Sequence, residues 1–390
     1  MINRIDRDYL IQTLTDLIRI ESINPDLVVG GSGEAAIAAY VAEAMAQLGL
    51  ETTSHEAVPG RPSVVGRRVG TGGGRSLMLN GHLDTVGVAG MPDPFSATLR
   101  EGKLYGRGAY DMKGSIAAML AAAKALHEAN LALAGDVLLA AVADEEYASL
   151  GTAEVIEHYQ VDGAIVTEPT QMQLCLAHKG FVWLTVETIG RAAHGSRFDE
   201  GIDANMRMGR FLAELEQLEK SLREQSGHPL VGPPSLHAAM LAGGTELSAY
   251  AASCQLKIER RTIPGETETQ VVTEIQALID RLMAADPTFQ ATVEAFFVRE
   301  PFEVAAEAEL VQAVERAAGQ VLGQAPAPVG ETFWADAALL AAAGVETVMI
   351  GPSGGGAHAK EEWVEVESLV KLAEILAQTA QGYCRYNYHR

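Results

Sequence analysis

Short runs of consecutive apolar residues alternate with amphipathic stretches along the first part of the chain. The apolar runs occupy 76–82, 135–143 and 162–169, and an Ala-rich stretch of helical character spans 114–129. Continuous apolar strands separated by helices are typical of a mostly parallel sheet with helices on both faces. Residues 1–179 are therefore predicted to form the first part of an α/β domain.

The pattern changes near residue 180. Strand-like segments alternate with two amphipathic helical segments in the order strand 181–189, helix 204–225, strands 235–241 and 254–262, helix 269–285 and strand 289–298. This β-α-β-β-α-β order is that of a ferredoxin-like sandwich. We predict a separate α+β domain over 180–298, whose roughly 120 residues are a normal domain size.

The α/β rhythm returns after residue 299. Helical patterns cover 310–323 and 333–344, and a buried strand covers 345–351. This last strand resembles the strands of the first part of the chain. We therefore predict that the second domain is inserted into the first and that 299–390 complete the first domain.

Composition and charge narrow the classes of function. Of the 390 residues 48% are hydrophobic, and 51 acidic against 29 basic residues give a formal net charge of -22. Such a chain is globular, and it would be repelled by nucleic acid and by anionic membrane surfaces. Apolar runs are all much shorter than the roughly 18 residues that a bilayer span requires.

The cysteines and the N-terminus suggest the compartment. Cys175, Cys254 and Cys384 are far apart and odd in number, so neither a disulfide framework nor a thiolate zinc site is expected. Residues 1–20 have an amphipathic helical pattern without the apolar core and cleavage site of a signal peptide. A cytoplasmic protein is the expectation.

Acidic residues and two histidines follow the predicted strands. In an open α/β sheet, functional groups collect just beyond the carboxyl ends of the strands. Five segments place such residues there or in the connecting loops: His82 and Asp84, Asp111, Glu145 and Glu146, Glu168, and His358.

This many carboxylates at one edge of a sheet would repel one another unless cations lie among them. Imidazoles and carboxylates together form a ligand set that suits zinc, and cobalt or manganese can substitute. Asp84 is expected to accept the second N–H of His82 and so orient the ring. Each segment alone is typical of a turn or helix cap, so the prediction of a metal site depends on all five converging.

The motifs that carry these residues resemble a known family. GHLDTV, YGRGAYDMKGSIAAML, ADEEYASLGT, TEPT, AHGS and GGGAHAKEEW, in this order, are similar to the di-zinc metallohydrolases that include acetylornithine deacetylase, succinyl-diaminopimelate desuccinylase, aminoacylase and carboxypeptidase G. The resemblance covers essentially the whole chain. It implies a zinc exopeptidase-like catalytic domain, an inserted ferredoxin-like domain that serves as dimerisation surface and lid, and a homodimer.

The resemblance also implies the metal ligands. His82 and Glu168 would bind one divalent ion, Glu146 and His358 would bind the other, and Asp111 would bridge the two. Zn²⁺ is the expected metal, with Co²⁺ or Mn²⁺ as alternatives. The family often has a cis peptide bond immediately after the bridging aspartate.

Four further residues receive roles from the resemblance. Glu145 would be the general acid and base, and Asp84 would support His82. His194 would reach the partner subunit's active site and stabilise the oxyanion, and Arg261 would bind a substrate carboxylate. The family usually has Asn and Pro where this chain has Ser248 and Ala251, so one hydrogen bond to substrate is expected to differ.

The implied reaction is removal of an acyl group from an N-acyl amino acid by a metal-activated water. Glu168, where carboxypeptidase and dipeptidase relatives often have Asp, favours a deacylase. A metallo-carboxypeptidase or dipeptidase that takes short peptides is the alternative within the family.

The sequence disfavours three other classes of protein. The segment 351–355 fits the G-x-S-x-G pattern of serine hydrolases, but a loop follows it where the nucleophile elbow needs a helix. The glycines of 70–74 precede a strand, whereas a dinucleotide-binding loop precedes a helix. A non-catalytic binding module is disfavoured because every proposed ligand and the base are present.

Overall fold

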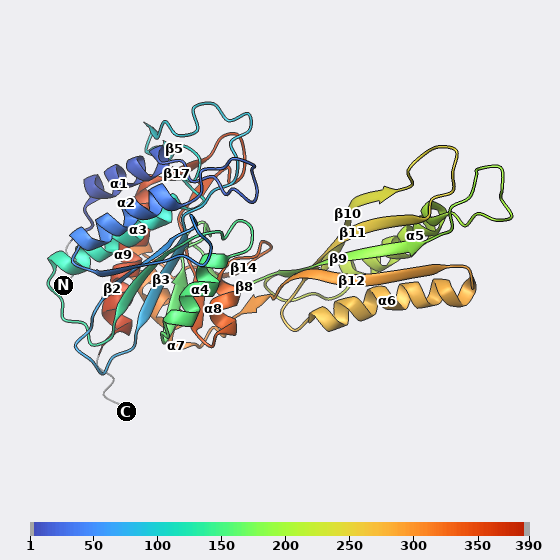
Figure 1. Cartoon of the computed structure of the whole chain (residues 1–390). Helices are drawn as coiled ribbons and strands as arrows, with labels where there is room; N and C mark the ends of the chain where they lie inside the picture. Colours follow the sequence, from blue (N-terminus) through green and yellow to red (C-terminus); the bar gives the residue numbers. More distant parts are fainter. Residues whose placement is uncertain (1–3, 386–390) are drawn as a thin grey trace. The chain divides into compact units, whose positions relative to one another are not determined.

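The computed structural model describes residues 4–385, which form two compact units (Figure 1). The first unit contains the chain up to Leu176, the segment Val304–Val329 and the chain from Ala335 onward. The second unit contains Ala177–Glu303 and the short segment Gly330–Trp334. The second unit is thus inserted in the sequence of the first, and a short later segment around residue 332 also belongs to it.

A mixed sheet forms the centre of the first unit. Its strand order is β1-β2-β6-β3-β7-β15-β8, and β8 also pairs with the short strands β13 and β14. The bounds are β1 Glu51–His55, β2 Ser63–Arg68, β3 Leu77–His82, β6 Val137–Val142, β7 Gly163–Val166, β8 Leu174–His178, β13 Phe302–Glu303, β14 Pro328–Glu331 and β15 Glu346–Met349. The four strands β6, β3, β7 and β15 run parallel, whereas β1, β2 and β8 are antiparallel to their neighbours. The predicted α/β class is confirmed, with a parallel centre and antiparallel flanks.

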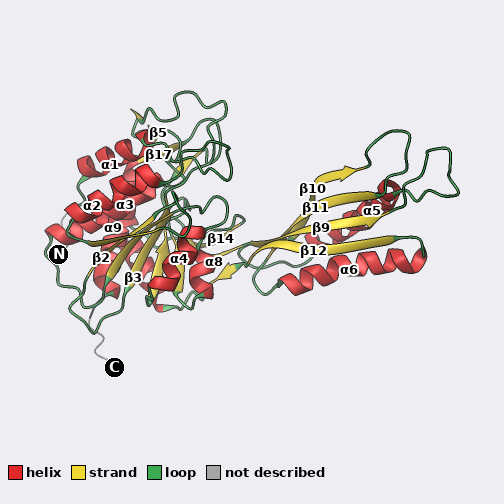
Figure 2. Ribbon diagram, in the orientation of Figure 1, coloured by secondary structure: helices red, strands yellow, loops and turns green. Residues whose placement is uncertain are grey.

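Helices lie on both sides of this sheet (Figure 2). The helices of the first unit are α1 Arg7–Arg19, α2 Ala35–Gln47, α3 Lys113–Glu128, α4 Leu150–His158, α7 Glu309–Leu322, α8 Ala337–Ala342 and α9 Val366–Tyr383. α3 packs against α1 and α9, and α4 packs against α8. Neighbouring residues of β3 show the two faces: the side chain of Asn80 contacts Thr152 of α4, while Gly81 faces Ile116 of α3.

A small antiparallel sheet supports two loops of the first unit. Its order is β16-β17-β5-β4, with β4 Thr98–Arg100, β5 Lys103–Tyr105, β16 Gly354–Gly355 and β17 Trp363–Glu365. Trp363 pairs with Tyr105, so the loop after β5 and the loop between β16 and β17 leave the same sheet. These two loops carry Asp111 and His358.

The second unit has the predicted ferredoxin-like arrangement. Its elements are β9 Gly180–Ile189, α5 Ala204–Arg223, β10 Ser235–Gly243, β11 Ser253–Thr262, α6 Glu268–Ala285 and β12 Gln290–Arg299. The sheet is antiparallel with the order β10-β11-β9-β12, and α5 and α6 pack together beside it. Side chains of β11 alternate between exposed and buried, which places one face on the core formed with both helices.

One predicted helix was too long. The pattern at 333–344 indicated a single helix, but α8 begins at Ala337. Trp334 instead belongs to the second unit, where its indole Nε1 donates a hydrogen bond to the carbonyl oxygen of Glu300 at 3.0 Å. The Trp334 side chain is therefore held by a tertiary contact, which a helical pattern of apolar residues does not reveal.

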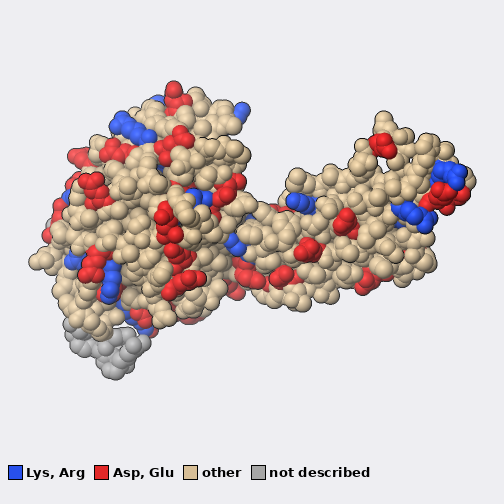
Figure 3. Space-filling model, in the orientation of Figure 1, with Lys and Arg blue, Asp and Glu red and all other residues tan. Residues whose placement is uncertain are grey.

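The surface agrees with the acidic composition. On the face shown in Figure 3, Asp and Glu side chains are spread widely, with Lys and Arg dispersed among them. Within the described residues, every helix is too short or too polar to cross a membrane.

Candidate metal centre and active site

The structure brings the five predicted metal ligands into two overlapping groups. His82, Asp111 and Glu168 form one group, and Asp111, Glu146 and His358 form the other. Within each group, ligand atoms of the three side chains lie within 4.8 Å of one another. Because Asp111 belongs to both groups, it lies between two potential ion positions.

The carboxylate of Asp111 addresses both histidines. Its Oδ1 lies 3.1 Å from Nε2 of His82, and its Oδ2 lies 3.2 Å from Nε2 of His358. Glu168 Oε1 is 3.6 Å from His82 Nε2, and Glu146 Oε2 is 3.1 Å from His358 Nε2. Two nitrogen and several oxygen donors arranged around a bridging carboxylate fit a pair of divalent cations. The peptide bond after Asp111 is cis, as the resemblance implied.

Burial and mutual repulsion perturb the acidic groups. Burial, together with the charges of Asp111 and Glu146, raises the pKa of Glu168 to about 8 against the opposing charge of His82. Burial also raises the pKa of Glu145 well above its usual value, and the charge of Glu168 adds to this. Without cations, the site can avoid like-charge repulsion only by holding protons.

The two imidazoles behave in the complementary way. Hydrogen bonds to Asp111 and Glu146 raise the pKa of His358 to about 10. Burial alone would raise the pKa of Asp111, but the hydrogen bonds from His358 and His82 lower it below its usual value. Metal binding at this site must therefore displace protons from the histidines.

Asp84 acts differently from the prediction. Nδ1 of His82 lies 2.9 Å from the backbone carbonyl oxygen of Asp84, whereas the nearer carboxylate oxygen is 3.6 Å away. The carboxylate instead accepts hydrogen bonds from the backbone N–H groups of Glu145 at 3.1 Å and Glu146 at 3.2 Å. Asp84 thus orients the His82 ring through its main chain and the Glu145–Glu146 loop through its side chain.

A buried polar network behind Asp84 was missed from the sequence. Nδ2 of Asn24 donates to Asp84 at 2.8 Å and to Asp144 at 2.9 Å. Arg61, which is 7% exposed, donates to Asp144 at 2.8 Å and also pairs with the fully buried Glu34. No sequence motif marks the loops in or beside which Asn24, Glu34 and Arg61 lie. The one sign of this network in the sequence was Asp144, an additional acidic residue beside Glu145.

Glu362 joins the two loops that supply Asp111 and His358. Its Oε1 accepts hydrogen bonds from the backbone N–H groups of Tyr110 at 2.9 Å and Asp111 at 3.0 Å. Its Oε2 accepts from Gly108 N at 3.1 Å and from Arg107 at 2.6 Å. Both Arg107 and Glu362 lie within motifs of the predicted site. They are 255 positions apart in the sequence, so only the tertiary structure reveals that they form an ion pair.

Asp336 is a further buried carboxyl beside the site. The hydroxyl of Thr152 donates to Asp336 Oδ2 at 2.5 Å and accepts from Nδ2 of Asn80 at 3.1 Å. Burial raises the pKa of Asp336 to about 6. The charge of Asp336 also raises the pKa of Glu145 and of Glu168, although burial and other charged groups have larger effects on both. The sequence pattern predicts only that Asp336 lies in a helix.

His194 and Arg261 lie in the second unit. His194 is exposed, and its Nδ1 is 2.8 Å from the hydroxyl of Ser196. The guanidinium of Arg261 donates to Glu259 at 2.7 Å and lies 5.1 Å from the ring centre of Phe181. Their roles toward substrate therefore rest on the resemblance.

Local structure also bears on two of the alternatives. The short strand β16 follows Ser353 directly, where a serine nucleophile elbow requires a helix. Gly72 and Gly73 have positive φ angles of 96° and 80° in a turn that leads toward β3. A dinucleotide-binding loop would instead open a helix.

Comparison with known proteins decides the family. The model of peptidase family M20/M25/M40 matches residues 78–382. The chain belongs to this family. It is accordingly a hydrolase that acts on amide bonds.

Relatives include acetylornithine deacetylase of Myxococcus xanthus, 30% identical over 381 residues, covering 95% of this chain and 97% of that protein. N-formyl-4-amino-5-aminomethyl-2-methylpyrimidine deformylase of Bacillus subtilis is 28% identical over 380 residues, covering 89% of each chain. The two relatives act on different substrates, so the family alone does not define the acyl compound.

Solved structures share the fold. Aminopeptidase PepT from Bacillus cereus superimposes with a TM-score of 0.80 at 18% identity, covering 98% of this chain and 100% of that one. The YXEP protein of Bacillus subtilis, described as a dinuclear metal binding peptidase of the M20 family, has a TM-score of 0.74 at 15% identity over 96% and 97% of the two chains. The predicted fold class is thereby confirmed.

Proposed function

We propose that this M20-family hydrolase holds two divalent cations and removes the acyl group of an N-acyl amino acid. The observation that carries the proposal is the position of Asp111, whose two carboxylate oxygens each face a different histidine. His82 and Glu168 complete one ligand group, and Glu146 and His358 complete the other. Zn²⁺ is the proposed metal because the donors are imidazole nitrogens and carboxylate oxygens, although Co²⁺ and Mn²⁺ suit the same set.

Glu145 is the proposed general acid and base. Bound cations would supply Lewis acidity, which lowers the pKa of water and polarises an amide carbonyl. Glu145 takes a proton from the attacking water and returns it to the departing nitrogen. Asp84 holds the backbone of Glu145 and Glu146 by two hydrogen bonds, so the base and a ligand are positioned by one side chain. The raised pKa of Glu145 suits a group that must hold a proton near neutral pH.

The proposed substrate carries a carboxylate. Arg261 would bind that group, because a guanidinium can form two parallel hydrogen bonds with a carboxylate. His194 would stabilise the oxyanion. Glu168 favours a deacylase over a carboxypeptidase or dipeptidase of the same family, which is the second candidate.

A homodimer through the second unit is also proposed. β10 is an edge strand of the four-stranded sheet, and its residues 237–243 are all exposed. Met240 is 64% exposed and Leu241 is 56% exposed on this edge. Exposed, uncharged edge strands are prone to pair with another strand. Association of two copies along β10 would cover both side chains.

A cytoplasmic location completes the proposal. The three cysteines are buried and lie outside any disulfide bond. Cysteines that are not joined in disulfides suit a reducing compartment.

The deciding experiment assays ion-free protein reconstituted with Zn²⁺, Co²⁺ or Mn²⁺ on a panel of N-acetyl, N-succinyl and N-formyl amino acids and dipeptides. Glu145→Gln should bind the same number of ions but lose activity by about 10²–10⁴-fold. The exposed Glu43→Gln removes the same charge elsewhere and should retain full activity. Unchanged turnover in Glu145→Gln would remove Glu145 from its role.

Mixing inactive variants tests whether His194 acts on the partner's site. In a random mixture of His194→Ala and Glu145→Gln subunits, half of the dimers are mixed. Each mixed dimer then has one complete site if the histidine acts across the interface, so about a quarter of the native activity should return. Absence of rescue in a mixture shown to exchange subunits would mean that His194 does not act in trans.

A further inference from the structure

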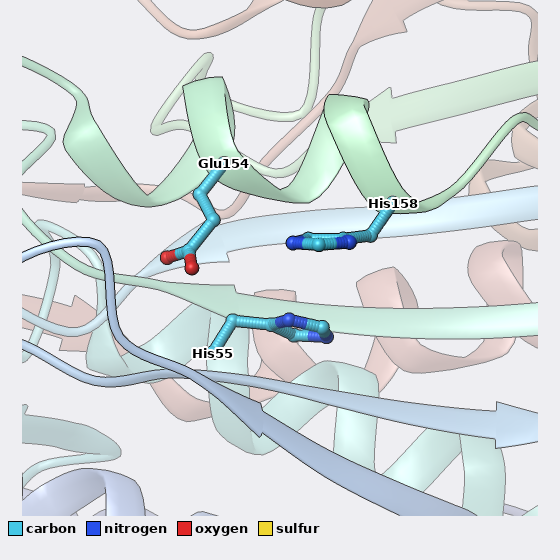
Figure 4. A group of neighbouring side chains, drawn as sticks. All are labelled: His55, Glu154 and His158. Atoms are coloured by element: carbon cyan, nitrogen blue, oxygen red, sulfur yellow. The ribbon is translucent and has the colours of Figure 1, made fainter.

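A third group of metal-ligating side chains lies between β1 and α4 in the first unit. His55 is the last residue of β1, and Glu154 and His158 lie one turn apart on α4. Figure 4 shows the three side chains facing one another across the space between the strand and the helix. Ligand atoms of all three lie within 4.8 Å of one another. No residue is shared with the two groups around Asp111.

Two of these side chains are already held in place. Oε2 of Glu154 accepts a hydrogen bond from the backbone N–H of Ala57 at 2.7 Å. Nε2 of His55 lies 3.0 Å from the hydroxyl of Tyr159. When this Nε2 carries the proton and donates it to the hydroxyl, the lone pair of the ring is on Nδ1 and is free to bind a metal. This use of the second ring nitrogen is usual for histidines that ligate metals.

The third side chain can adjust. The rings of His55 and His158 stack with centroids 4.6 Å apart and planes inclined by 23°. Metal–nitrogen bonds of about 2.0–2.1 Å require donor atoms roughly 3.4 Å apart in a tetrahedral site. His158 is exposed, so rotation of its side chain can unstack the rings and turn its nitrogen toward the other two donors.

The surroundings favour the neutral form of His55. Burial lowers its pKa, the charge of His158 lowers it further, and Glu154 opposes these effects. Neutral imidazole is the form that binds metal. The rings are held by stacking, and the hydrogen bond from Ala57 holds the Glu154 carboxylate beside them, so the three donors are already close together.

We propose that His55, Glu154 and His158 form a further binding site for a transition-metal ion such as Zn²⁺. Two imidazole nitrogens and one carboxylate oxygen would be the protein ligands, with water in the remaining position. The ion would connect edge strand β1 to α4. Because α4 begins just after the Glu145–Glu146 loop, with Gly151 N donating to Ala143 O at 3.0 Å, the ion would stabilise the helix that supports this loop.

The test separates this site from the paired one. In the background His82→Ala/His358→Ala, which removes a histidine from each group around Asp111, the protein should still bind one Zn²⁺ per chain in equilibrium dialysis. Adding His158→Ala should weaken this binding at least tenfold and abolish the rise of the thermal midpoint on adding Zn²⁺. Adding His127→Ala, an exposed histidine in the last turn of α3, should change neither.

The native chain gives a second measurement. Saturated protein should hold three ions per chain, and His55→Ala or His158→Ala should hold two while keeping the activity of the paired site. Equal ion content and affinity in His158→Ala and His127→Ala would overturn the proposal. The same would follow if the background variant bound no Zn²⁺ while remaining folded by circular dichroism. Neither outcome would touch the proposed hydrolase function, which is assayed at the other site.

Discussion

Glu362 is expected to hold the Asp111 loop in place for metal binding. One carboxylate accepts four hydrogen bonds, three from the backbone of 108–111 and one from Arg107. Glu362 is 1% exposed and Arg107 is 3% exposed, so water cannot replace these bonds. Glu362→Gln keeps the shape and one acceptor oxygen but puts an NH₂ group where Arg107 and Gly108 donate.

The burial of the Arg107–Glu362 ion pair sets the free-energy cost of the Glu362→Gln substitution. Removing one partner of a buried ion pair destabilises by about 3–5 kcal/mol. The retained oxygen can still accept from Tyr110 and Asp111, so the lower end, about 3 kcal/mol, is expected for the local opening of this loop. Since about 1.4 kcal/mol corresponds to a factor of ten, opening should become about a hundredfold more frequent.

Hydrogen exchange measures this opening directly. In ion-free protein, the amides of Gly108, Tyr110 and Asp111 should exchange about a hundredfold faster in Glu362→Gln than in the native chain. Binding of Zn²⁺ should weaken in parallel, because the loop must be ordered first. Glu361→Gln removes the same charge at the adjacent exposed residue and is the matched control. Exchange rates within about twofold of the control would refute the proposed role of Glu362 in holding this loop.

Two further predictions concern pH and the Thr152–Asp336 contact. In ion-free protein the pKa of His358 is raised to about 10 from 6.5, so this group contributes stability below pH 6.5 that is lost as pH rises to 10. The pKa of Glu168 is raised to about 8 from 4.5, so the folded state loses stability as pH rises from 4.5 to 8. The thermal midpoint in chelator should therefore fall between pH 6 and pH 9 and depend less on pH after Zn²⁺ is added; a flat profile in chelator would contradict this. Thr152→Val leaves a buried carboxylate oxygen without its donor and should lower the free energy of unfolding of the first unit by about 1–3 kcal/mol in urea, whereas Thr152→Ser, which keeps the hydroxyl, should cost less than half as much.

The grouping of the proposed metal ligands was predictable because strand ends were predictable. The apolar runs that became β3, β6 and β7 are continuous, as expected for strands covered on both faces, and His82, Glu146 and Glu168 come at or just after their ends. Parallel strands place those ends at one edge of the sheet. Local pattern and topology therefore suffice to collect these side chains.

Residues that support the ligands were not predictable in this way. Asp84 was expected to contact the His82 ring, yet its carboxylate binds the next loop, because the backbone carbonyl of Asp84 already lies at the ring nitrogen. Arg61 and Glu34 are charged residues that composition places at the surface, but they are buried as a pair. Such burial is favourable only when both partners meet, which the sequence of either segment does not reveal.

By itself the sequence determined the two kinds of domain, their order and the residues able to hold cations, since hydrophobic periodicity and donor chemistry are local properties. Tertiary structure alone decided which carboxylate faces which donor: Glu362 with Arg107, Asp336 with Thr152, and His55 with the helix that carries Glu154 and His158. These pairs form between segments whose local patterns are independent of each other, and their energies depend on distance and burial, which exist only once the chain has folded.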